Sequence, residues 1–188
     1  MITESEVQKI ISSEFKDCLR SMKQISWDPV NEIALVDKED RFHHYDIMAE
    51  KFYGDKPKSP DMLLFHNETL VFVEFKNGKI GSKEKDKIKL KAIEGCFIIL
   101  FKIISRYNKA IGFTDIFKLK KSYILVYDTD KNTRERIRDR KHANLTRFGL
   151  EHYNGTFFHQ VSTLSRDIFI QWLHKRRLIG KETNDGEI

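Results

Sequence analysis

Several residue types and patterns that mark particular protein classes are scarce in this chain of 188 residues. Cysteine occurs only at Cys18 and Cys96, with no CxxC motif, which argues against a disulfide framework and favours buried thiols in a reducing compartment. With three prolines and nine glycines, the chain has no flexible internal linker. The most hydrophobic segment, CFIILFKIIS, is too short to span a membrane and contains a lysine. The first residues lack the apolar region of a signal peptide, so we expect a cytoplasmic protein without a membrane segment.

Nucleotide-binding and zinc-binding motifs are also missing from the sequence. It has neither the GxxxxGK[ST] phosphate loop nor the GxGxxG dinucleotide fingerprint, so nucleotide hydrolysis and dinucleotide redox chemistry lack support. His43 and His44 are adjacent and therefore point apart, and the later histidines have no partner at the spacing of metal ligands. Zinc chemistry is not indicated.

The composition is that of a basic globular domain. Hydrophobic residues make up 40% and charged residues 33%, and Lys plus Arg exceed Asp plus Glu by 34 to 28. The formal net charge of +6 favours acidic partners, nucleic acid before an anionic membrane. The length and apolar content predict one domain over residues 1–178, followed by a polar, disordered tail over residues 179–188.

The hydrophobic pattern predicts an α/β sandwich around a mixed central sheet. The stretch 27–54 fits either a helix or strands. Gly95 weakens the long helix locally, but it would allow this helix to approach the sheet closely. The predicted elements are a helix from Thr3 or Ser5 to about Met22, strands over 61–65 and 70–75, a helix over 82–106, a strand over 122–127, a late strand within 155–161 and a closing helix capped by Ser165.

Three charged residues stand where the core is being assembled. In the strand VFVEFK, alternate side chains share a face, so Glu74 and Lys76 lie side by side at its C-terminal end. If the HNET connection makes the two strands neighbours, Asp61 comes to lie beside Glu74. Two close carboxylates repel each other unless a cation lies between them, and Mg²⁺ prefers such oxygen ligands. The backbone carbonyl of Phe75 would supply a further oxygen.

Pro60-Asp61, a spacer and then Glu74-Phe75-Lys76 resemble the signature of the PD-(D/E)xK nuclease superfamily, which includes restriction endonucleases and Holliday-junction resolvases. The resemblance covers roughly residues 4–128 and implies a restriction-endonuclease-like α-β-β-β-α-β core. It also implies a nuclease that hydrolyses phosphodiester bonds in nucleic acid, DNA before RNA, with Mg²⁺ or Mn²⁺ held by Asp61 and Glu74. Lys76 would orient or acidify the attacking water and offset the charge of the phosphorane.

The resemblance leaves other candidate residues open. Members of the family often add an acidic residue from the first helix, and Glu14 and then Glu6 are candidates, with Asp46 and Glu50 as competitors. Lys87 and Lys91 are four residues apart, so they share a helix face that could meet a phosphate backbone, support the active site or serve only as a solvated surface.

Two other interpretations remain at this point. Glu74 and Lys76 can be an ordinary ion pair at the end of a strand, with Asp61 forming a turn after Pro60. The fold can also serve as a catalytically silent module that binds nucleic acid or assembles with other subunits. Beyond Asp128, the late strand and closing helix can extend the sheet, recognise a substrate or form the surface of a homo-oligomer.

Overall fold

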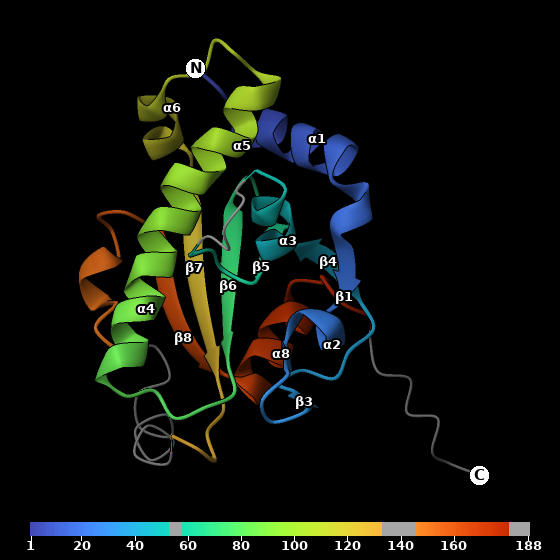
Figure 1. Ribbon diagram of the computed structural model, residues 1–188, viewed down its shortest axis with the longest axis vertical. Helices are drawn as coiled ribbons and strands as arrows, with labels where there is room; N and C mark the ends of the chain where they lie inside the picture. The colour runs from blue at the N-terminus through green and yellow to red at the C-terminus, as the bar shows by residue number, and fades with distance from the viewer. Residues whose placement is uncertain (53–57, 133–145, 181–188) are drawn as a thin grey trace.

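A mixed sheet of six strands forms the centre of the computed structural model, which describes residues 1–52, 58–132 and 146–180 (Figure 1). The first four strands are antiparallel to their neighbours, whereas β6, β7 and β8 run parallel to one another. A two-stranded antiparallel hairpin stands apart from this sheet, formed by β2 (Trp27–Asp28) and β3 (Ile33–Ala34). In spatial order the sheet consists of β1 (Leu19–Ser21), β4 (Arg41–His44), β5 (Met62–Phe65), β6 (Leu70–Lys76), β7 (Lys121–Tyr127) and β8 (Gln160–Ser165).

Helices cover both faces of the sheet. One face lies against α1, α3, α4 and α5, and the other lies against α2 and α8 (Figure 1). The helices are α1 (Glu4–Glu14), α2 (Met22–Ile25), α3 (Tyr45–Glu50), α4 (Ser82–Ile93), α5 (Leu100–Tyr107), α6 (Phe113–Lys118) and α8 (Arg166–Lys175), with short 3-10 turns η1 (Lys16–Cys18) and η3 (Glu151–Tyr153). The predicted α/β architecture with a mixed central sheet is therefore confirmed.

The alternation of side chains in β6 divides the core into two parts. Phe72 packs on the face that α4 covers, whereas Val71 and Val73 pack on the face that α8 covers. Glu74 has the same parity as Phe72, so its carboxylate enters the layer beneath α4 rather than solvent. Both thiols, Cys18 and Cys96, are free and buried, as expected from their sequence context.

The long helix predicted over 82–106 is present, with a break in its geometry. A π-helical segment, η2 (Glu94–Ile99), lies between α4 and α5. Gly95 lies in this segment against Ser59 and Pro60, and a Cβ added there would lie 3.0 Å from Ser59 Cα and overlap Pro60. The hydroxyl of Tyr45 donates a hydrogen bond to the Gly95 carbonyl at 2.9 Å, which satisfies a carbonyl of this segment. Gly95 is thus the point of close approach.

Two predicted boundaries are wrong. The first helix ends at Glu14, not near Met22, because Leu19–Ser21 pairs with the β4 strand and is drawn into the sheet. The late strand begins at Gln160, after a turn in which Gly155 has a positive φ of 73°. Of the two candidate caps of the first helix, Thr3 is the one used, and Ser165 caps the closing helix as predicted: their side chains accept hydrogen bonds from the first turns of α1 and α8.

The first residue of the predicted polar tail is buried in the core. Ile179, assigned above to the polar tail, is buried with the residues beneath α8, whereas residues 181–188 lie outside the described part. In residues 1–52, 58–132 and 146–180, no helix is long and apolar enough to cross a membrane.

Candidate active site

The pairing of β5 with β6 brings two carboxylates together. Met62 is paired with Val73, and one further step of this antiparallel register places Asp61 opposite Glu74. The Phe75 backbone N–H donates a hydrogen bond of 2.6 Å to Asp61 Oδ2, which fixes this side chain against the end of β6. Glu74 is fully buried, and 17% of the Asp61 side chain is exposed. The convergence expected from the sequence is present.

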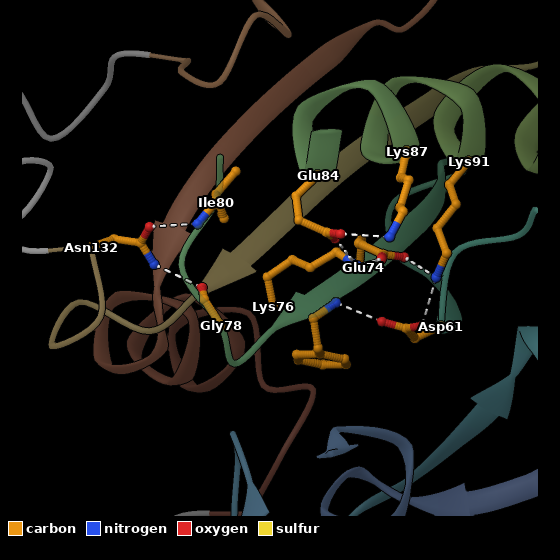
Figure 2. Close-up of polar contacts among 10 residues, drawn as sticks. Asp61, Glu74, Lys76, Gly78, Ile80, Glu84, Lys87, Lys91 and Asn132 are labelled. Carbon is orange, nitrogen blue, oxygen red and sulfur yellow. Dashed lines mark hydrogen bonds and ion pairs between the residues drawn. The ribbon is translucent and has the colours of Figure 1, made fainter. Parts of the chain in front are cut away.

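Two lysines hold these carboxylates (Figure 2). The Nζ atom of Lys91, from α4, lies 3.2 Å from Asp61 Oδ1 and 2.9 Å from Glu74 Oε2. The Nζ atom of Lys76 lies 3.0 Å from Glu74 Oε1, an oxygen that has no partner in hydrogen-bond geometry among the described residues. These four residues, Asp61, Glu74, Lys76 and Lys91, are called the acid–lysine cluster below. Lys91 therefore belongs to the site itself rather than to an exposed basic face.

A second layer of charges continues the cluster towards solvent. Glu84 Oε2 lies 3.5 Å from Lys76 Nζ, and Glu84 Oε1 accepts a 2.7 Å hydrogen bond from Lys87 (Figure 2). The Lys87 side chain is 58% exposed, so it is the more available of the two helix lysines for a phosphate. Glu84 was not among the residues singled out from the sequence. Its spacing of three and seven residues from Lys87 and Lys91 is the signal that places all three on one helix face.

Burial and charge pull the pKa values of the cluster in opposite directions. Burial, reinforced by the charge of Asp61, raises the pKa of Glu74 to about 7, while Lys91 and Lys76 act to lower it. Burial lowers the pKa of Lys91, but the charges of Asp61, Glu74 and Asp46 outweigh this effect, and its pKa is raised overall. Two ammonium groups thus balance two carboxylates. A bound dication would leave an excess of positive charge unless Lys91 moved away.

The candidates for a third acid lie in different places. Glu14 is exposed at the end of α1, where it accepts a hydrogen bond from Ser13, and Glu6 forms a capping box with Thr3. Within the described residues, neither is joined to the cluster. Glu50 is exposed at the end of α3. Asp46 is different.

Asp46 is 8% exposed on α3 and accepts a hydrogen bond from Ser59, two residues before Asp61. Its charge also helps to raise the pKa of Lys91. Asp46 is therefore a candidate acid whose charge acts on the cluster.

The turn after Lys76 is clamped to the neighbouring strand. The side chain of Asn132 accepts a 3.0 Å hydrogen bond from the Ile80 N–H and donates one of 3.1 Å to the Gly78 carbonyl (Figure 2). It also donates to the Asp128 carbonyl at the end of β7, at 2.8 Å. The chain that leaves the cluster is thereby held in one position before α4 begins.

A solvent-facing cavity of about 470 Å³ adjoins the cluster. Asp61, Lys76 and Glu84 line one part of it, and residues 25–31, from the β2–β3 hairpin and its approach, line another. Its size is within the range of about 300–1,000 Å³ that is usual for ligand pockets. The cluster is therefore reachable from outside, although Glu74 itself is buried.

The cluster supplies two of the oxygen ligands that a hard divalent cation would need. Asp61 Oδ1 and Glu74 Oε2 already converge on one cation, the Lys91 ammonium, and carboxylate oxygens are what Mg²⁺ prefers. The described residues contain no group of three or more His, Cys, Asp or Glu side chains that could hold a metal ion. A bound Mg²⁺ would therefore depend on two carboxylates and on water, with the Phe75 carbonyl as a predicted further ligand.

The chain matches no protein-family model, no curated protein and no solved structure. What the structure defines is a class: an α/β protein with a mixed six-stranded sheet and a charged cluster at the end of two adjacent strands.

Proposed function

We propose that this protein is a metal-dependent nuclease that hydrolyses phosphodiester bonds in nucleic acid, DNA before RNA. One observation carries the proposal: the carboxylates of Asp61 and Glu74 converge on a single cation, with Lys76 3.0 Å from Glu74, beside an open cavity. An isolated surface ion pair would not need a fully buried carboxylate held by two lysines.

The order of elements supports the same proposal. With the other elements set aside, among them α3 between β4 and β5, the elements α1, β4, β5, β6, α4 and β7 occur in the α-β-β-β-α-β order that the resemblance to PD-(D/E)xK nucleases predicts. Asp61 precedes the middle strand of the three, and Glu74 and Lys76 end the third, next to the parallel strand β7. This position of the three residues at the ends of adjacent strands supports the proposal.

Each residue of the cluster has a distinct role in this proposal. Asp61 and Glu74 would hold Mg²⁺ or Mn²⁺, which when bound would activate water and neutralise charge on the phosphate. Lys76 would orient the attacking water and offset the negative charge that develops on the phosphorane. Lys91, which spans both carboxylates, would have to give up at least one of its contacts to let the metal in.

The test is cleavage by the full chain of supercoiled, linear, single-stranded and branched DNA, and of RNA, in Mg²⁺, in Mn²⁺ and in EDTA. We expect metal-dependent cleavage that Lys76→Ala reduces at least about 100-fold, because the charge on the phosphorane loses its partner. Metal binding, measured by calorimetry, should persist in Lys76→Ala and be lost in Asp61→Asn. Lys83→Ala and Asp86→Asn, which change exposed residues of α4, are the matched controls.

Two outcomes would contradict the proposal. Binding of nucleic acid without cleavage under any of these conditions would identify a silent module with this fold. An absence of Mg²⁺ and Mn²⁺ binding to the intact chain would show that the cluster is a structural ion-pair network. Thermal melting of each variant would separate loss of chemistry from loss of folding.

A further inference from the structure

The β2–β3 hairpin presents apolar side chains to solvent beside the acid–lysine cluster. Trp27 is 49% exposed, Val30 88% and Ile33 53%. Trp27 and Val30 line the same cavity of about 470 Å³ as Asp61 and Lys76. An exposed tryptophan next to the acid–lysine cluster offers a flat apolar face to a molecule that enters the cavity.

The hairpin is tied to the strand that carries the cluster. The buried side chain of Asn77, the residue after Lys76, donates hydrogen bonds to the carbonyls of Ser26 at 3.3 Å and Ile33 at 3.2 Å. Ser26 in turn exchanges two hydrogen bonds with the backbone of Val36. Both strands of the hairpin are therefore fixed to the end of β6, so the Trp27 ring has a defined place relative to the cluster.

The turn of the hairpin is also ordered. The carboxylate of Asp28 accepts hydrogen bonds from the Val30 N–H at 2.9 Å and from the Asn31 side chain at 2.6 Å. The hydrogen bond from the Asn31 side chain lowers the pKa of Asp28. Lys79, exposed, lines the cavity as well. An aromatic face is thus combined with cations that suit a phosphate backbone.

We propose that Trp27 stacks on an unpaired base of a single-stranded or locally opened nucleic acid whose backbone lies at the acid–lysine cluster. In a duplex each base face is covered by its neighbours, so only an unpaired base can offer a face to the indole ring. The inference rests on the proposed function and names its substrate class, and Lys79 would contact the adjoining phosphate.

Binding measured without cleavage tests the inference separately from the nuclease proposal. In EDTA, fluorescence anisotropy would compare a labelled single-stranded oligonucleotide with its duplex, for the wild type and for Trp27→Ala and Trp27→Phe. We expect Trp27→Ala to weaken single-strand binding about ten-fold or more and Trp27→Phe to retain most of it, since phenylalanine also stacks. The salt dependence of binding should stay the same, because no phosphate contact is removed.

The second tryptophan supplies the control. Trp172 is stacked on Phe169, with ring centroids 6.0 Å apart, and lies beneath Arg176. Trp172→Phe should bind like the wild type, and its remaining emission, from Trp27 alone, should be quenched by the single strand and not by the duplex.

Three results of the binding and association measurements would overturn the inference: unchanged single-strand binding by Trp27→Ala, a preference for the duplex, or a dimer in solution that Trp27→Ala dissociates. The last would make the hairpin a protein interface. Cleavage without quenching would overturn this inference alone, whereas quenching without cleavage would support it and count against the nuclease proposal.

Discussion

Replacing Lys91 by methionine removes the ammonium between two carboxylates while keeping a side chain of similar length. The ammonium lies 3.2 Å from Asp61 and 2.9 Å from Glu74. Breaking a fully buried ion pair costs about 3–5 kcal/mol, because the remaining charge is left without compensation. Here Glu74 keeps Lys76 at 3.0 Å and Asp61 is partly exposed, so we expect a smaller loss, about 2–3 kcal/mol.

This loss is measurable as a change in melting temperature. For a chain of this length, 1 kcal/mol corresponds to about 2–4 °C, so Lys91→Met should melt about 5–10 °C below the wild type in EDTA. The variant should then gain more from Mg²⁺ or Mn²⁺ than the wild type does, because the metal no longer competes with the ammonium. A ligand at a hundred times its Kd stabilises the folded state by about 2.7 kcal/mol, enough to restore most of the loss.

Lys87→Met is the matched control. Lys87 lies one turn earlier on the same face of α4, but it is 58% exposed and pairs with Glu84, so its loss should cost at most about 1 kcal/mol. Scanning calorimetry of the three proteins, with and without metal, gives the answer. The reasoning is refuted if Lys91→Met and Lys87→Met melt together in EDTA. Equal metal-induced shifts in the wild type and Lys91→Met would refute the competition between metal and ammonium.

Three further predictions concern the surroundings of the cluster. Gly95→Ala should cost about 1–3 kcal/mol in urea denaturation because its Cβ would overlap Pro60, whereas Gly78→Ala, which meets open space, should be nearly neutral; a stabilised Gly95→Ala would contradict the close approach. Lys121 is buried, and burial lowers its pKa from 10.5 to about 8. Between these values the unfolded chain keeps a proton that the folded chain has released, so stability should rise with pH, by up to about 1.4 kcal/mol per pH unit. Lys121→Met should lose this rise, and an identical pH profile would refute the assignment. Asn77→Ala should cost about 1–3 kcal/mol and weaken oligonucleotide binding in EDTA, because the hairpin loses its link to β6; unchanged binding would show that the hairpin is held without this link.

Local patterns were enough to locate the residues of the cluster along the chain but not to assemble them. The period of two in β6 places Glu74 and Lys76 on one face, and the helical period places Lys87 and Lys91 on another. The meeting of Asp61 with Glu74 required the register of β5 with β6, which the sequence left conditional on the HNET connection. The first helix was predicted too long because its apolar period continues through Leu19, and only the pairing with β4 shows that this segment is a strand.

By itself, the sequence determined the features that depend on neighbours along the chain: the strand and helix periods, the cap at Ser165, and the charges at the end of β6. Tertiary structure alone decided which lysine of α4 enters the cluster and which aromatic side chain lines the cavity beside the cluster. Lys91 reaches both carboxylates because Gly95 lets the helix lie against Pro60, and Trp27 faces the cavity because Asn77 ties the hairpin to β6. Contacts between segments distant in sequence depend on packing and on register, and neither leaves a periodic signal in the chain.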